Sequence, residues 1–443
     1  MTNIILGLSR YVLVFLLSLY TLHCFIGFGP GREEERKSIY ILQAVYLILL
    51  HTLGFLCMFY RTSDPDALFF CALQNVTLIG FMVLIRILYP KASRLLVNNM
   101  LLFLSAGLIM IFRLSRADHF RQFIIAVVSL IVILPLPYLI KKAGRLKEAS
   151  YGLGISGLLL LSFVLVIGRV TRGSRLSVSV AGVFFQPSEF VKILFIFCLA
   201  GIYSSEEFFS DSKKDKETSL IKTGIAGLIA AAHVLILVLS KDLGGALIFF
   251  TVYWCMTYAA LKKPWIPAAF AGTGMLSFIV GYKLFPHVRN RFLSWRDPFS
   301  YIENQGYQIT QSLFAIGTGS WFGMGLFEGS PDKIPIVARD FIFSAISEEL
   351  GSFFSILLIM VIVCTFLIFI NTAMDCDDPY FRLVSTGIAV CYGFQTFLNI
   401  GGVIRFIPLT GVTLPLVSYG GSSLLSTMIM FGIILGIMGI EYE

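Results

Sequence analysis

Ionisable side chains interrupt the apolar segments of this sequence, and their types could support acid–base chemistry on an anionic substrate. Such groups are costly in an apolar environment, so they should face a cavity or pair with one another. Carboxylates among them could accept protons, and basic residues could stabilise phosphate oxygens. The four constellations lie at 186–192, 241–245, 339–351 and 408–423.

The first two constellations each allow a structural and a functional interpretation. Glu189 and Lys192 are three residues apart on one predicted helix face, just after Pro187, which suits a first helical turn. They form either a structural ion pair or part of a substrate site. Asp242 precedes two glycines at 244–245, so it either caps the next helix or turns its carboxylate inward at a helix break.

The other two constellations flank the last apolar segments. Asp340 stands where a long loop ends and an apolar helix begins, and helix capping would explain it. Capping does not explain Glu348 and Glu349, which lie within the predicted span. Segment 408–423 is rich in small and hydroxyl residues. It could present backbone N–H groups to a phosphate, or it could serve close helix packing.

The elements that must position these residues are membrane helices. Of the 443 residues, 57% are hydrophobic and only 14% are charged, whereas soluble domains contain about 25% charged residues. Apolar runs long enough to cross a bilayer recur along the chain, which predicts an all-α polytopic membrane protein. The thirteen predicted spans lie near 4–28, 39–60, 68–88, 95–113, 121–141, 150–169, 185–204, 222–240, 243–261, 265–284, 341–370, 382–404 and 419–440.

Charge in the connecting segments predicts an orientation. Dense lysine clusters at 141–147 and 213–222 place those segments in the cytoplasm, the N-terminus outside and the C-terminus inside. The opposite face is rich in arginine, because long loops escape the charge rule or because the arginines face an anionic ligand. The long segment 285–339 lies on this outer face, and its apolar and aromatic residues predict an ordered loop.

Other residue classes exclude alternative chemistries. The net charge of +8 arises mainly from the connecting segments, so lipid and orientation explain it better than nucleic acid. The eight cysteines are scattered without a CxxC pair and mostly lie in apolar runs. We interpret them as small hydrophobic residues. The five histidines are equally dispersed, so no zinc site is indicated.

The four constellations, in this order, resemble the SEDS family of shape, elongation, division and sporulation proteins (RodA, FtsW and SpoVE). Its pattern of QPSE with a lysine, DLG, DFIF with EELG, and PxTGxxLPxxSYGGSS is matched at 186–192, 242–244, 340–351 and 408–423. The resemblance covers roughly residue 98 to the C-terminus. It implies a ten-span core at 95–443, preceded at 1–94 by three extra spans. Local departures include Arg339, where the family usually has threonine.

The resemblance implies a multi-pass protein of the bacterial plasma membrane that polymerises peptidoglycan from lipid II. The donor would be a glycan on undecaprenyl diphosphate, and the acceptor would be the 4-hydroxyl of another lipid II sugar. One carboxylate base suffices for an inverting displacement, and we predict that this base is Asp340. Lys192, with Arg175 or Arg291, would stabilise the leaving diphosphate. A divalent cation, Mg²⁺ or Mn²⁺, is a further candidate for this support.

The remaining predicted site residues bind substrate. Glu189, Asp242 and Glu348 are expected to line the same cavity. The others are Gln186, Ser188, Gln308, Asn399, Ser418 and Ser422. The resemblance also implies a partner, a class B penicillin-binding protein that crosslinks the strands. The alternatives are a lipid II flippase without bond chemistry and a scaffold within a cell-wall complex, which would need none of these buried charges.

Overall fold

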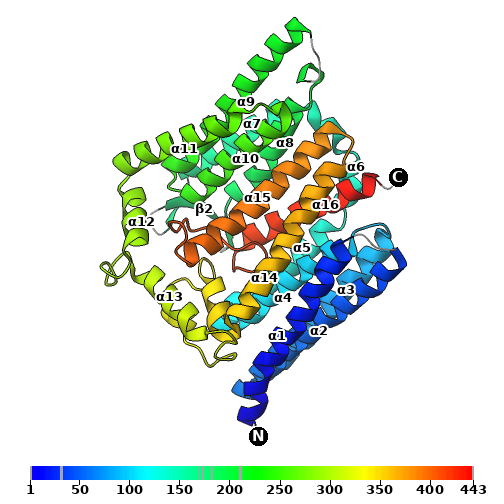
Figure 1. Ribbon diagram of the computed structural model, residues 1–443, viewed down its shortest axis with the longest axis vertical. Coiled ribbons are helices and arrows are strands. Elements are labelled where there is room, and N and C mark those ends of the chain that lie inside the picture. The colour runs from blue at the N-terminus through cyan, green and yellow to red at the C-terminus, as the bar shows by residue number, and fades with distance from the viewer. Residues whose placement is uncertain are drawn as a thin grey trace.

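The computed structural model describes residues 2–29, 33–167, 169–171, 174–180, 183–208 and 212–441, and helices dominate it (Figure 1). Within that part of the chain, twelve helices are long and apolar enough to cross a membrane, which confirms the predicted helical membrane architecture. The α-helices are α1 (Thr2–Phe28), α2 (Glu33–Thr62), α3 (Pro65–Leu88), α4 (Arg94–Leu114), α5 (Arg116–Ile133), α6 (Leu136–Lys141), α7 (Ser150–Ile167), α8 (Ser188–Tyr203), α9 (Lys213–Leu239), α10 (Leu243–Leu261), α11 (Trp265–Leu284), α12 (Pro286–Arg296), α13 (Tyr307–Gly319), α14 (Ile342–Asp375), α15 (Pro379–Val403) and α16 (Gly421–Glu441).

One predicted span differs from the rest. The segment predicted at 185–204 forms α8, which has 16 residues. At about 1.5 Å per residue this helix is about 24 Å long, shorter than a bilayer core of about 30 Å. It packs against α7, α9, α10, α15 and α16, and most of its residues are buried. Protein therefore surrounds α8 along most of its length, and its first turn can carry charge without meeting lipid.

A short antiparallel sheet, which the sequence analysis did not predict, lies between α7 and α8. Its strands are β1 (Arg169–Thr171), β2 (Ser174–Val180) and β3 (Val183–Phe185), in the order β1-β2-β3. Val178 on β2 pairs with Phe185 on β3. The sheet brings the chain directly to Gln186 and Pro187, where α8 begins.

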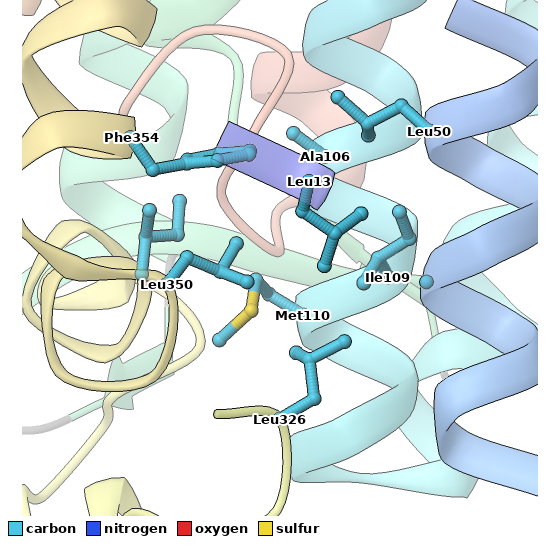
Figure 2. Close-up of a pocket in the computed structure, with 10 residues that line it drawn as sticks. Leu13, Leu50, Ala106, Ile109, Met110, Leu326, Leu350 and Phe354 are labelled. Atoms are coloured by element: carbon cyan, nitrogen blue, oxygen red, sulfur yellow. The ribbon is translucent and has the colours of Figure 1, made fainter. Parts of the chain in front are cut away.

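Helices α1, α2 and α3 pack beside one another along one edge of the bundle (Figure 1). They cover α4, whose residues from Leu95 to Phe112 are all buried. The junction of α1, α2, α4 and α14 is apolar and closely packed. A small void of about 10 Å³ remains there. Figure 2 shows the side chains that line it, which include Leu13, Leu50 and Phe354. A void of this size holds at most one water molecule, so it is a packing defect and not a ligand site.

Buried polar groups also join α1 and α2 to the rest of the bundle. The Tyr20 hydroxyl donates to Asn99 Oδ1 (2.8 Å), and Asn99 Nδ2 donates to Thr365 Oγ1 (3.1 Å). His51 Nδ1 lies 2.8 Å from Ser105 Oγ. Such hydrogen bonds between helices stabilise packing in an apolar environment. The division of the chain at residue 94 stays a prediction.

The segment 285–339 is well organised, and it contains helices that the sequence analysis did not predict. It carries α12, α13 and the short 3₁₀ helix η3 (Pro331–Lys333). Part of it is held by a break in α14 at Gly351, whose φ of +90° is disfavoured for other residues. Beside this break, the backbone N–H groups of Met324 and Gly325 donate to the carbonyl oxygens of Glu348 and Glu349, both at 2.9 Å.

Contacts to the segment 285–339 show which helix ends lie on the same face of the bundle as this segment. Arg10 near the start of α1 donates to the Gly323 carbonyl oxygen (2.8 Å), and Arg61 near the end of α2 pairs with Glu328 (3.1 Å). The start of α9 lies at the opposite end of the molecule from α13 (Figure 1). The lysines at 213–222 and the long segment therefore lie on opposite faces, in the alternation that the predicted topology requires.

Candidate active site

A cavity of about 1160 Å³ opens where the beginnings of several helices meet. Its lining comes from α5, α8, α10, α12, α13 and α16, and from the segments at 336–340 and 409–413. Direct hydrogen bonds join these segments. The Gln186 backbone N–H donates to Ser422 Oγ (2.9 Å), and Ser188 Oγ donates to Asp242 Oδ2 (3.4 Å). The predicted site residues in the lining are Gln186, Ser188, Glu189, Lys192, Asp242, Arg291, Gln308, Asp340 and Ser422.

The first turns of α8 hold an ion pair at the cavity wall. Lys192 Nζ lies 2.8 Å from Glu189 Oε2, and the two side chains are 4% and 14% exposed. Lys192 also donates to Gln395 Oε1 (2.8 Å), and Ser426 Oγ donates to Glu189 Oε2 (3.0 Å). The pair that the sequence spacing predicted therefore exists. Because both residues also line the cavity, the pairing leaves the substrate-binding interpretation open.

Asp242 combines the two roles that its sequence context allowed. It is the N-cap of α10, and its Oδ1 accepts a hydrogen bond from the Gly245 backbone N–H (2.8 Å). Its carboxylate also lies at the cavity wall, near Ser188 of α8. Capping thus fixes the position of a carboxylate that is accessible from the cavity.

Arg291 of α12 reaches across to the segment 409–411. Its Nη1 donates to the carbonyl oxygens of Leu409 (3.2 Å) and Thr410 (2.6 Å). Burial lowers the pKa of the Arg291 guanidinium, while the nearby carboxylates of Asp242 and Asp340 raise it. Arg291 is therefore a partly buried cation that interacts electrostatically with both acids.

Asp340 faces the same glycine as Arg291. A Cβ atom at Gly411 would lie 3.7 Å from Arg291 Nη2 and 3.8 Å from Asp340 Oδ2. Gly411 has a φ of +76°, which favours glycine, and its missing side chain keeps space open beside both groups. The capping interpretation of Asp340 is wrong. The N-cap of α14 is Phe341, with no side-chain capping bond, and the Asp340 carboxylate lies in the cavity lining.

Two predicted substrate-binding residues support the backbone behind this wall instead of lining it. Asn399 Nδ2 donates to the carbonyl oxygens of Asp340 (3.0 Å) and Val412 (2.7 Å). Ser418 Oγ donates to the Arg339 carbonyl oxygen (2.5 Å). These hydrogen bonds fix the position of the segment that carries Asp340 and of the segment that contains Gly411.

Glu348 does not line the cavity, so that prediction is wrong. Its Oε1 accepts a hydrogen bond from the Ser330 backbone N–H (2.8 Å). Its neighbour Glu349, with a side chain 0% exposed, pairs with Arg113 at 2.8 Å. Arg113 also pairs with Asp332 at 3.3 Å. We call Arg113, Asp332, Glu348 and Glu349 the anchor cluster, because they hold the segment 323–332 against α14. The separation arises because α14 carries Glu348 about two turns away from Asp340.

Arg175 lies on β2, and its side chain is outside the described part of the structure. The sequence analysis missed Gln395, whose Nε2 donates to the Thr413 carbonyl oxygen (3.1 Å) while its Oε1 accepts from Lys192. A buried glutamine in the apolar α15 was the available signal. Arg121 and Tyr419 were also missed as lining residues.

The geometry brings carboxylates and cations together around one open space, which suits proton abstraction beside an anionic leaving group. Below, the cavity cluster means Glu189, Lys192, Asp242, Arg291 and Asp340. Within the described ranges, no group of three or more His, Cys, Asp or Glu side chains could hold a metal ion.

Comparison with known proteins identifies the family of this chain. A family model described as "Cell cycle protein" (FtsW, RodA, SpoVE) matches residues 66–442, a range that includes α3 and leaves out α1 and α2. The chain is 32% identical over 373 residues to peptidoglycan glycosyltransferase RodA of Mycobacterium tuberculosis, covering 79% of this chain and 78% of that protein. It is 30% identical over 317 residues to the probable peptidoglycan glycosyltransferase FtsW of Bacillus subtilis, covering 68% and 76%.

Solved structures show the same fold. A chain from the structure titled "Structural coordination of polymerization and crosslinking by a peptidoglycan synthase complex" matches with a TM-score of 0.65 and 26% identity, covering 80% of this chain and 99% of that one. The rod shape determining protein RodA of Thermus thermophilus matches with a TM-score of 0.57 and 24% identity over the same shares. Sequence and fold together show that this multi-pass membrane protein belongs to the RodA, FtsW and SpoVE (SEDS) family of peptidoglycan glycosyltransferases.

Proposed function

We propose that this protein polymerises peptidoglycan glycan strands from lipid II. The donor is a glycan on undecaprenyl diphosphate, and the acceptor is the 4-hydroxyl of a second lipid II sugar. The observation that carries the proposal is the position of Asp340 beside Arg291 at the wall of a cavity large enough for sugar substrates. Family membership supports the same reaction class.

In the proposed reaction, the Asp340 carboxylate accepts the proton of the acceptor hydroxyl. The hydroxyl oxygen forms a bond to the donor's anomeric carbon, while the bond from that carbon to the diphosphate oxygen breaks. Attack opposite the leaving group inverts the configuration, and one base is sufficient for it. The electron pair of the broken bond leaves with the diphosphate, which needs cations more than it needs a proton.

Arg291 and Lys192 supply those cations. Both are held in place before substrate binds, because Arg291 donates to two backbone carbonyls and Lys192 contacts Glu189 and Gln395. Cations held in this way need little rearrangement when negative charge develops on the leaving group. Mg²⁺ commonly binds through one or two carboxylates together with substrate phosphates, so Asp242 would hold such an ion together with the diphosphate, and Asp340 would remain free to act as the base.

The arrangement of the lining favours a polymerase over a lipid II flippase. The carboxylates of the cavity cluster lie near the beginnings of α8, α10 and α14. A hydrogen bond from Ser188 to Asp242 joins the beginnings of α8 and α10. A translocation path would instead need polar groups at both depths of the membrane. The charges gather at one face of the bundle, as a reaction at that face requires.

The face that carries the cavity is proposed to be the outer one, where flipped lipid II is available. Single cysteines at Ser320 and Ser212, in a background without reactive native thiols, test this placement. Both serines are exposed. We expect an impermeant thiol reagent added to intact cells to label position 320 and not position 212. The reverse labelling would place Asp340 in the cytoplasm and contradict the mechanism.

The direct test of the reaction is an assay of the purified full-length protein with lipid II alone. We expect glycan strands that a muramidase degrades. Movement of lipid II across a vesicle membrane without strand formation would instead support the flippase. We further propose a class B penicillin-binding protein as the partner, since one matching structure is titled as a complex that polymerises and crosslinks. Adding that protein should convert the strands into crosslinked material.

A further inference from the structure

A second group of basic side chains lines the cavity on the side of α5. Arg121 of α5, Arg339 and Tyr419 all belong to the lining. The Arg339 guanidinium carbon lies 5.4 Å from the centroid of the Tyr419 ring, a cation–π contact. The Tyr419 side chain also contacts Arg121 and Asp118 of α5. Tyr419 thus gathers two arginines at one wall.

The backbone around these residues is held by contacts between segments that are distant in sequence. The Tyr419 backbone N–H donates to the Ala338 carbonyl oxygen (2.7 Å). Gln122 of α5 donates to the Ser418 carbonyl oxygen (3.2 Å) and accepts from the Gly420 backbone N–H (3.2 Å). The two arginines therefore occupy a wall that is organised without any ligand, as a binding subsite should be.

The cavity lining contains more basic side chains than the two that the proposed leaving diphosphate uses. It contains five basic side chains from Lys and Arg but only three carboxylates. Lys192 pairs with Glu189, and Arg291 interacts with Asp242 and Asp340. Arg121 and Arg339 lie with Tyr419 on the α5 side, where Tyr419 also contacts Asp118 of α5. Asp340 follows Arg339 directly in the chain.

The proposed reaction brings two diphosphates into one site, one on the donor and one on the acceptor. The donor diphosphate is bonded to the carbon that is attacked, so it must lie beside Asp340 and Arg291. The acceptor hydroxyl is at the opposite end of its sugar unit from its own diphosphate. That second diphosphate must therefore find cations at a different place in the cavity.

We propose that Arg121 and Arg339 form a second anion subsite, which binds the diphosphate of the acceptor lipid II. The inference rests on the proposed polymerase function. Two guanidinium groups suit a diphosphate, because each can donate paired hydrogen bonds to phosphate oxygens. The N–H groups at the start of α16, beside Gly420 and Gly421 in the same lining, add favourable dipoles.

The kinetic test uses the full-length protein in proteoliposomes, with a preformed glycan on undecaprenyl diphosphate as donor and labelled lipid II as acceptor. Arg121→Gln and Arg339→Thr should each raise the KM for lipid II about tenfold, since a charged hydrogen bond is lost. The KM for the donor and kcat should stay within about threefold of wild type. Arg289→Gln is the matched control, because Arg289 is exposed on α12 and does not line the cavity.

Charge-preserving variants separate binding from structural support. Arg121→Lys and Arg339→Lys should recover part of the lost acceptor affinity, because they keep the cation but lose the paired hydrogen bonds. Lysine variants as impaired as Gln or Thr would overturn the subsite. So would a rise in the donor KM alone, an unchanged acceptor KM, or a fall in kcat alone.

A binding count keeps the subsite testable even if the proposed reaction fails. Native mass spectrometry of the full-length Asp340→Asn protein should show two bound lipid II molecules, and the added double change Arg121→Gln with Arg339→Thr should leave one. Two molecules in both proteins would refute the subsite. Failure of the wild-type protein to form glycan would refute the polymerase proposal, and the binding count would be unaffected by it.

Discussion

The cavity cluster and the anchor cluster each contain a basic side chain that is buried beside a glutamate, yet the surroundings of the two pairs differ. Lys192 of the cavity cluster is 4% exposed, and Arg113 of the anchor cluster is 9% exposed. Arg113 and the glutamates of α14 contact the loop at 329–332, including its backbone at Gly329 and Ser330. Lys192 contacts side chains and opens onto the cavity. Burial alone therefore does not identify a reactive charge, whereas an open space beside it does.

One sequence motif, residues 340–351, contributes to both clusters. Residues 340–351 form a continuous family pattern, but its first residue faces the cavity and its glutamates hold the loop. Gly351 then breaks the helix so that the loop can bind the exposed carbonyl groups. If this division is correct, substitutions in the cavity cluster should affect rate, and substitutions of the buried anchor residues, such as Arg113 and Glu349, should affect stability.

The largest expected effect is the loss of the base. Asp340→Asn should reduce strand synthesis by about 10²–10⁴-fold, the range expected for removing a general base, since an amide does not accept the proton. Folding should be nearly unchanged, because Asp340 does not cap α14. Initial rates and thermal unfolding of the purified protein measure the two quantities. Asp332→Asn is the control in the anchor cluster, because its 67% exposed side chain should contribute little. Substantial synthesis by a folded Asn variant would contradict the assignment.

The next effect concerns the ion pair on α8. Glu189→Gln and Lys192→Met should each inactivate the protein, because each leaves a buried charge without its partner. The double variant should regain stability without regaining activity, since the cation near the diphosphate is still missing. Thermal unfolding and glycan synthesis separate these effects. Full activity in the double variant would show that the Glu189–Lys192 pair only stabilises the fold, as the Arg113–Glu349 pair of the anchor cluster does.

A smaller effect on rate, but a large one on stability, is expected in the anchor cluster. Glu349→Gln should reduce stability by about 3–5 kcal/mol, as expected when one partner of a buried pair is removed. Protein that remains folded should polymerise at close to the normal rate. Unfolding experiments and limited proteolysis at 320–332 report the loss.

Replacing both partners shows how much of the lost stability comes from leaving Arg113 buried without a partner. Arg113→Met combined with Glu349→Leu should recover part of the stability, because apolar side chains of similar size can replace a buried pair. If the single Glu349→Gln variant instead retained stability and lost catalysis, the contrast between the two clusters would be wrong.

The smallest expected change in free energy is at Gln395, which contacts Lys192 and Thr413 from behind the cavity wall. Gln395→Leu should slow synthesis roughly tenfold, through the loss of one hydrogen bond to a charged group. Gln395→Glu should retain more activity, because it still accepts a hydrogen bond from Lys192. Equal rates for the wild-type and Leu proteins would show that Glu189 alone positions the lysine.

The sequence predicted the fold class and the residues of the cavity cluster, and its errors have a common cause. Glu189, Lys192, Asp242 and Asp340 were found because each interrupts or ends an apolar run. Glu348 met the same criterion and was misplaced, while Asn399 and Ser418 support backbone and do not line the cavity. Sequence spacing shows that a polar group needs a partner, but it does not show whether that partner is a loop, a helix or a substrate.

The sequence by itself determined the helical membrane architecture, because the length and apolarity of a segment are local properties that decide whether it can cross a bilayer. It also determined the order of the motifs. Only the tertiary structure decided which charges face one another. Arg291 and Asp340 meet beside Gly411 across three segments far apart in the chain. That meeting depends on how helices of unequal length pack and where α14 breaks, which are properties of the assembled bundle.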